Sequence, residues 1–204
     1  VAVLFATLAQ RMAREMAALP PLRAYTISLV GSLAGVGLFA VVSWLQLSPT
    51  WWFGVGFTAA VPLLFTGEMV GGRLVRARVA VVAVNVALLA STLGLVHVMA
   101  RGSLWSPYYR VTVGQDGPDT VVEVNNIFHQ SMAPVVQKEY FYRWPYMVFG
   151  DTFENVLVLG AGSGTDVAAA LRHGAKHVDA VEIDPVIVRL GRQWHIAASG
   201  GRIV

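Results

Sequence analysis

The sequence predicts an α-helical transmembrane segment, then a small β-hairpin region, then the start of an α/β domain. Three observations lead to this fold class. Long uncharged apolar runs occur within residues 1–101, β-prone runs with turn residues follow in 102–150, and residues 151–204 contain a strand, a glycine-rich turn, a helix and a second strand. Hydrophobic residues make up 55% of the chain and charged residues 13%, with a mean hydropathy of +0.58. This balance is typical of proteins with membrane spans.

The N-terminal region is predicted to contain about three spans and part of a fourth. Ala24–Ser48 and Val79–Ala100 contain no Asp, Glu, Lys or Arg, and each is long enough to cross a hydrocarbon core of about 30 Å. Thr50–Gly67 is also uncharged but shorter, so it is either a span or a re-entrant segment. Val1–Gln10 resembles the end of a helix that leaves the bilayer. We therefore expect a multi-pass protein of the cell membrane, with the lipid bilayer as a partner.

The net charge of +3 does not indicate a nucleic-acid partner. Residues 1–100 hold six arginines against Glu15 and Glu68, whereas residues 101–204 hold nine basic and ten acidic residues. The basic excess therefore lies in short loops between apolar runs, where it influences membrane topology. The chain has no cysteine, which excludes disulfides and thiolate chemistry. Its histidines lack metal-ligand spacing, and no metal site is predicted.

The arginine clusters make conflicting demands on topology. By the positive-inside tendency, both clusters should face the cytoplasm. If all three uncharged runs cross the membrane, the region after residue 101 emerges on the opposite side, away from a cofactor made in the cytoplasm. We expect that region to be cytoplasmic, which requires that Thr50–Gly67 does not fully cross or that the charge rule fails here. The clusters are Arg11, Arg14 and Arg23, and Arg73, Arg76 and Arg78.

The middle region is predicted to be rich in β-structure. Tyr108–Val113 and Thr120–Val124 are β-prone runs separated by a cluster of turn residues, which predicts a hairpin with a loop longer than two residues. Asn125-Asn126 predicts a second turn. The aromatic segment Val135–Phe149 predicts a helix that is broken near Pro145.

The C-terminal region contains the first half of a Rossmann-like nucleotide-binding fold, with the rest of the domain expected beyond the chain. Asn155–Leu159 is a short apolar run typical of a buried parallel strand. It leads into the glycine-rich turn Gly160–Asp166, a helical pattern over Val167–His173, and a second strand, Val178–Asp184, that ends in acids.

Each part of this pattern has a chemical reason. Glycines let the backbone turn tightly close to a ligand, and the following helix presents its positive end. Glu182 follows Gly164 by 18 residues, where a carboxylate can accept hydrogen bonds from ribose hydroxyls. Glycines at alternate positions favour an S-adenosylmethionine-type ligand over NAD, because the former has no diphosphate to bind. The expected cofactor-binding residues are Gly160, Ala161, Gly162, Ser163, Gly164, Glu182 and Asp184.

At these residues the chain resembles the spermidine synthase family, the polyamine aminopropyltransferases, and looks most like the bacterial branch whose synthase domain follows transmembrane helices. The resemblance implies transfer of an aminopropyl group from decarboxylated S-adenosylmethionine to a polyamine-type amine, leaving methylthioadenosine. The resembling segments are Trp105-Ser106-Pro107-Tyr108-Tyr109-Arg110, the turn from Asn125 to Gln130, Glu139 to Tyr142, and Val156 to Pro185.

The resemblance also implies roles for residues on the substrate side, where this chain departs from the family. Tyr109 stands where the family usually has Gln, Arg143-Trp144 where it has His-Glu, and Ser163 where it has Asp. Without the family's Glu and Asp carboxylates, this site should bind a cationic diamine less favourably. The family's catalytic aspartate is expected beyond Val204, so we expect these residues alone to be inactive. The expected substrate-side residues are Tyr109, Gln130, Tyr142 and Asp166.

Two other functions remain open at this point. One is an S-adenosylmethionine-dependent methyltransferase acting on a membrane-proximal substrate, because the glycine loop and its acid do not separate the two enzyme classes. The other is a membrane transporter or scaffold with a degenerate nucleotide fold. The sequence is compatible with a homo-oligomer but does not identify the acceptor substrate.

Overall fold

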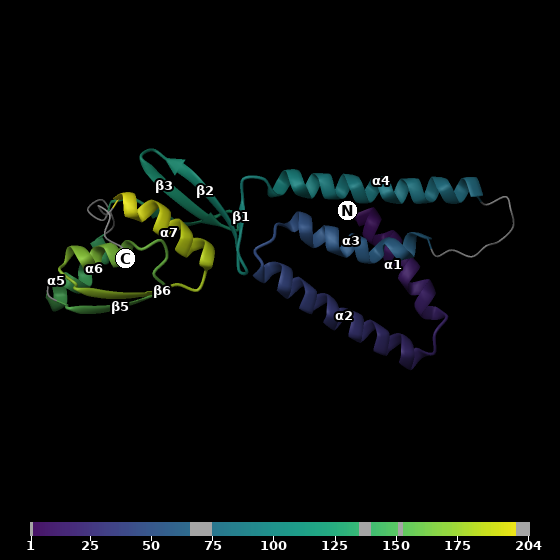
Figure 1. Ribbon diagram of the computed structural model, residues 1–204, viewed down its shortest axis with the longest axis horizontal. Helices are drawn as coiled ribbons and strands as arrows, with labels where there is room; N and C mark the ends of the chain where they lie inside the picture. Colours follow the sequence, from purple (N-terminus) through teal and green to yellow (C-terminus); the bar gives the residue numbers. More distant parts are fainter. Residues whose placement is uncertain (1, 66–74, 135–139, 151–152, 199–204) are drawn as a thin grey trace. The chain divides into compact units, whose positions relative to one another are not determined.

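The computed structural model describes residues 2–65, 75–134, 140–150 and 153–198 (Figure 1). The chain divides into two compact units, Val1–Arg101 and Gly102–Val204. We call them the N-terminal unit and the C-terminal unit and describe each by itself.

The N-terminal unit is helical. Pro21 lies in the first turn of its second helix, where a missing N–H costs no helical hydrogen bond. That helix ends at Trp44, two residues before Gln46, which has a positive φ of 57°. The helices in the described part of this unit are α1 (Ala2–Ala17), α2 (Pro21–Trp44), α3 (Pro49–Phe65) and α4 (Val75–Ala100).

Two of the described helical stretches are long and apolar enough to cross a membrane. They are α2 and residues Val82–Ala100 of α4, and only 6% of the most apolar part of each is buried in the protein. In α2, Leu33 is 73% exposed, whereas a core helix of a soluble domain buries its apolar face. α3 has 17 residues, which corresponds to a length of about 26 Å, and it is not among these candidates.

Some of the residues on which the predicted membrane topology depends lie outside the described ranges. Residues 66–67, the end of the uncharged run Thr50–Gly67, are among them, and so is Arg73. The side chains of Arg76 and Arg78 are also outside the described part of the chain. The membrane topology inferred from the arginine clusters therefore stays a prediction.

The C-terminal unit begins with an antiparallel sheet in the order β1-β2-β3-β4. The first hairpin differs from the prediction, because Asp116 pairs with Asp119 and leaves a loop of two residues. Gly117 has a φ of 59°, the positive value that a tight hairpin turn requires. The strands are β1 (Leu104–Trp105), β2 (Arg110–Asp116), β3 (Asp119–Val124) and β4 (Ile127–Met132).

The second predicted turn is confirmed. Asn125 and Asn126 have φ values of 52° and 64° and join β3 to β4, with Val124 paired to Ile127. Asparagine tolerates this left-handed conformation better than other residues with a Cβ. The Asn125 side-chain oxygen also accepts a hydrogen bond from the Arg110 N–H at 3.1 Å, which ties the turn to β2.

The aromatic segment forms two short helices instead of one broken helix. A 3-10 helix, η2 (Tyr140–Tyr142), precedes α5 (Trp144–Phe149). Pro145 lies in the first turn of α5, so it starts this helix and does not interrupt one. Residues 135–139 of the predicted helix lie outside the described residues.

The second half of the unit is a parallel βαβ arrangement, as the sequence predicts. Its first strand is not buried as expected, since Leu157 and Leu159 are 62% and 74% exposed, and its second strand ends at Val181 instead of Asp184. β5 (Asn155–Leu159) pairs in parallel with β6 (His177–Val181), and α6 (Thr165–Arg172) connects them. α7 (Pro185–Ala198) follows β6 and packs on β4, which places it beside the antiparallel sheet (Figure 1).

Two clusters of buried side chains hold this unit together. In the first, Val186 and Leu190 of α7 pack against Val111, Val122 and Met132 of the antiparallel sheet. The second contains Tyr146 of α5 with Ala169 and Ala170 of α6, and side chains of β5 and β6 pack against it. Burial of these apolar side chains packs α7 against the antiparallel sheet and α6 against the parallel strands β5 and β6.

Candidate functional site

The glycine-rich turn leaves β5 at Leu159 and enters α6 at Thr165. Gly160, Gly162 and Gly164 have φ values of 73°, 55° and 98°, a region that is costly for residues with a Cβ. The alternate glycines are therefore required by the path of the backbone. We call residues 160–164 the glycine loop.

Every backbone N–H of the glycine loop donates a hydrogen bond within the protein. Two of them bind side chains, one from β4 and one from the chain just after β6. The five bonds are Gly160 to Val181 O (2.8 Å), Ala161 to Val181 O (3.0 Å), Gly162 to Glu182 Oε2 (2.9 Å), Ser163 to Gln130 Oε1 (3.1 Å) and Gly164 to Ala161 O (2.8 Å).

Glu182 lies beside this loop, as the spacing predicts. Its Oε2 accepts the Gly162 N–H, and its Oε1 accepts the Asp184 N–H at 2.9 Å. A carboxylate oxygen has two lone pairs, so each oxygen can accept one further hydrogen bond. The two backbone contacts orient a half-buried carboxylate that can still bind a pair of neighbouring hydroxyl groups.

Asp184 has a different environment from Glu182. It is 0% exposed, and its Oδ1 accepts the N–H groups of Val186 and Ile187 at 2.8 and 3.2 Å, which caps the N-terminus of α7. Its Oδ2 accepts a hydrogen bond of 2.5 Å from the Ser106 hydroxyl. The geometry gives Asp184 contacts to the protein on both oxygens, and its backbone N–H orients Glu182.

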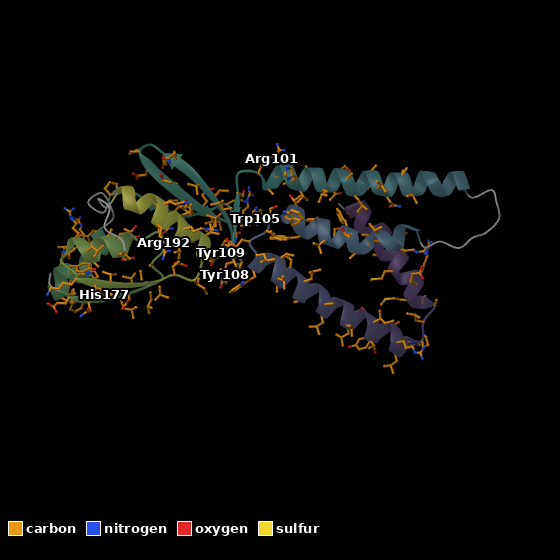
Figure 2. All side chains as sticks on the ribbon, in the orientation of Figure 1. Arg101, Trp105, Tyr108, Tyr109, His177 and Arg192 are labelled. Atoms are coloured by element: carbon orange, nitrogen blue, oxygen red, sulfur yellow. The ribbon has the colours of Figure 1, made fainter. Side chains whose placement is uncertain are left out.

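Ser106 connects the Ser-Pro-Tyr-Tyr segment to this cap. Its Oγ accepts the N–H groups of Tyr108 and Tyr109 at 3.1 and 2.8 Å, and its own N–H donates to the Tyr109 carbonyl at 2.9 Å. Tyr108 and Tyr109 lie next to each other on the resulting turn between β1 and β2, with ring centroids 6.2 Å apart (Figure 2). Hydrogen bonds therefore link this turn to the glycine loop through Asp184 and Glu182.

Two of the predicted substrate-side residues are connected to the glycine loop by hydrogen bonds, and the other two lie at α6. Gln130 contacts the loop directly, and Tyr109 is linked to it through Ser106. Tyr142 belongs to η2, which packs on α6, and Asp166 lies in the first turn of α6. Ser163, predicted on the cofactor side, is only 2% exposed, and its hydroxyl has no hydrogen-bond partner among the described residues.

Asp166 is half-buried next to the aromatic segment. Burial raises the pKa of its carboxyl group above the ordinary value of 3.8, while a hydrogen bond to its own backbone N–H lowers it. Burial also raises the pKa of the Tyr146 hydroxyl, and the negative charge of Asp166 adds to this effect. Tyr146 in turn stacks on the His173 ring, with centroids 4.3 Å apart. The charge of Asp166, in the first turn of α6, therefore acts on the Tyr146 hydroxyl.

The raised pKa of Asp166 predicts a pH dependence of stability. The folded chain binds a proton at Asp166 at a higher pH than the unfolded chain does, so the free energy of unfolding should fall as the pH rises through the raised pKa. Lowering the pH from neutral towards 3.8 should therefore stabilise the protein through this group. Melting temperatures of the wild type and Asp166→Asn across this range measure the difference, which should shrink as the pH falls. A difference that is constant with pH contradicts the prediction.

A cavity in this unit lies elsewhere along β5. It has a volume of about 270 Å³ and is lined by Pro145, Tyr146, Phe153, Asn155, Val156 and Leu157. Apart from Phe153, which precedes β5, these residues lie in α5 and in the first three positions of β5, whereas the glycine loop follows the last residue of that strand. We therefore base the candidate site on the loop and Glu182.

The cap at Asp184 and its bond to Ser106 were not predicted from the sequence. A signal for the cap was present, because Asp followed by Pro at the start of a helical pattern is a typical helix N-terminus. The Ser106 contact had no such signal, since these residues are 78 positions apart.

The chain is similar to Polyamine aminopropyltransferase 1 of Streptomyces coelicolor, with 28% identity over 218 aligned residues. The match covers 94% of this chain and 40% of the relative, so the chain spans about two fifths of that protein's length. No family model and no solved structure matches the chain. The similarity to this curated protein supports the resemblance to the spermidine synthase family, and with it a transferase, at the level of the family.

Proposed function

We propose that this chain provides the membrane anchor and the nucleoside-binding site of an aminopropyltransferase-like enzyme. The glycine loop and Glu182 would hold the adenosine part of decarboxylated S-adenosylmethionine, which supplies the aminopropyl group for a polyamine-type amine. Methylthioadenosine would be the product that remains in the site. The proposal rests on the similarity to a polyamine aminopropyltransferase and on the geometry of Glu182.

The hydrogen bonds of the glycine loop carry this assignment. A dinucleotide places its diphosphate against free N–H groups at such a turn, but all five N–H groups of this loop already donate to protein acceptors. A negative diphosphate would also meet the Glu182 carboxylate, which is unfavourable. The available acceptors on Glu182 suit neutral ribose hydroxyls, so the site fits a nucleoside without phosphates.

Titration of the full chain in detergent with methylthioadenosine tests this proposal. We expect saturable binding of methylthioadenosine and at least tenfold weaker binding of ADP, which carries the same sugar and a diphosphate, for the electrostatic reason above. Isothermal titration calorimetry measures both. Failure to bind methylthioadenosine, or tighter binding of ADP, would contradict a phosphate-free nucleoside site.

A methyltransferase is a second candidate, favoured by the residues that replace the family's acids. Ser163 carries no charge, and its side chain is buried, while Arg143 is exposed beside Trp144. Neither feature attracts a cationic amine. Incubation of the complete enzyme with S-adenosylmethionine or its decarboxylated form separates the candidates, because the aminopropyl reaction releases methylthioadenosine and methyl transfer releases S-adenosylhomocysteine.

We also propose that the N-terminal unit anchors the protein in the cell membrane as a multi-pass segment, with the C-terminal unit on the cytoplasmic side where the nucleoside is made. The two long apolar stretches and their exposed side chains support this. Retention in the membrane fraction after an alkaline carbonate wash tests the anchor. Protease protection of the C-terminal unit in sealed, right-side-out vesicles tests the side.

A further inference from the structure

Gln130 reaches the glycine loop because β4 contains a β-bulge. Glu123 of β3 pairs with Phe128, but Val122 pairs with Gln130, so His129 is an additional residue in β4. Without the bulge, His129 would lie opposite the buried Val122. A one-residue shift in register exchanges the two faces of a strand. The bulge therefore places Gln130 on the face of the sheet that packs against the rest of the unit.

The Gln130 side chain fits against the glycine loop at two consecutive residues. Its Oε1 accepts the Ser163 N–H at 3.1 Å. The same atom lies 2.6 Å from the position that a Cβ on Gly162 would occupy, which is too close for two unbonded heavy atoms. The glutamine and the missing side chain at position 162 are therefore complementary.

The remaining polar atoms at this contact are not optimised for folding. Gln130 Nε2 is buried and has no hydrogen-bond partner among the described residues, and the same holds for Ser163 Oγ. Burying an unpaired amide group is unfavourable for stability. A methionine of similar length would remove the unpaired Nε2 but would also leave the Ser163 N–H without its acceptor. The two costs oppose each other, so we expect the net contribution of Gln130 to stability to be small.

We infer that Gln130 is a positioning residue that sets the shape of the glycine loop for the ligand. By holding the Ser163 N–H from β4, it fixes the preceding peptide so that the Gly162 N–H meets Glu182 Oε2 at 2.9 Å. It acts through the loop and Glu182. The identity of the ligand in this inference rests on the proposed nucleoside site. The contact between Gln130 and the glycine loop does not depend on that proposal.

Gln130→Met removes the acceptor at nearly constant side-chain length. We expect the affinity for methylthioadenosine to fall about fivefold to tenfold while the melting temperature changes little, because the lost acceptor of the Ser163 N–H offsets the removal of the unpaired Nε2. We also expect faster hydrogen exchange in the peptide that contains Ser163, because its amide loses its acceptor. Gln115→Met makes the same chemical change on β2, where Gln115 binds Thr120, and should change neither the affinity nor that exchange rate.

A double-mutant cycle tests the complementarity of Gln130 and Gly162. Gly162→Ala introduces strain at positive φ in any background, so that part cancels in the cycle. The additional clash with Gln130 should make Gly162→Ala more harmful in the wild type than in Gln130→Ala, both for affinity and for melting temperature. Equal effects in both backgrounds, or unchanged exchange at Ser163 in Gln130→Met, would overturn the inference. If the wild type binds no methylthioadenosine, the proposed function fails, but the exchange rates and melting temperatures still decide the role of Gln130.

Discussion

Glu182→Ala should weaken the binding of methylthioadenosine by about 100-fold. The Gly162 and Asp184 N–H groups hold one lone pair of each carboxylate oxygen, and in the proposed site the remaining lone pairs would accept the two ribose hydroxyls. Hydrogen bonds to a charged acceptor contribute about 1.5–3 kcal/mol each, and two of them correspond to a factor of about 100 or more. Isothermal titration calorimetry on the full chain measures the loss.

Glu154→Gln is the matched control for this experiment. Glu154 is exposed and forms an ion pair with Lys176 at the surface, just before β5. Its neutralisation should leave the affinity unchanged, which excludes a general effect of removing negative charge. An affinity of Glu182→Ala within about twofold of the wild type would contradict the role of this carboxylate, since even one lost hydrogen bond to a charged group exceeds that difference.

Asp184→Ala should destabilise the C-terminal unit by about 3 kcal/mol. The substitution removes the cap of α7, a loss of about 1 kcal/mol, and deprives the buried Ser106 hydroxyl of its acceptor, which costs about 1–3 kcal/mol. It also leaves a cavity where a fully buried side chain stood. Urea unfolding, followed through the tryptophan fluorescence of the full chain, measures the change.

Asp184→Asn and Asp179→Ala provide the comparison. The asparagine keeps an acceptor for the Val186 and Ile187 N–H groups, so it should lose less stability than alanine and remain folded if alanine does not. Asp179 is exposed on β6, and its replacement should change the free energy of unfolding by less than about 0.5 kcal/mol. Equal effects of Asp184→Ala and Asp179→Ala would show that the cap and the Ser106 contact do not stabilise the unit.

Features that depend on neighbouring residues were largely predictable from the sequence. Asn125-Asn126 forms a turn because both residues tolerate positive φ. The order of strand, glycine loop, helix and strand is also confirmed, because each part has its own local pattern. The predicted length of the loop between β2 and β3 was wrong, since Gln115 binds Thr120 and extends β2 into residues that resemble a turn. The predicted effect of Pro145 was also wrong. Proline disrupts a helix interior, but it is compatible with the first helical turn, where Pro145 lies.

The sequence by itself determined the apolar stretches long enough to cross a bilayer, the glycine loop and the place of Glu182 after the second strand. These properties follow from composition and spacing along a short piece of chain. Only the tertiary structure decided that Gln130 supports the loop from 33 residues away and that Ser106 binds Asp184 across 78 residues. The bulge at His129 and the packing of α7 on the antiparallel sheet bring these groups together. Such contacts depend on how separate elements pack, and local sequence patterns carry no information about that packing.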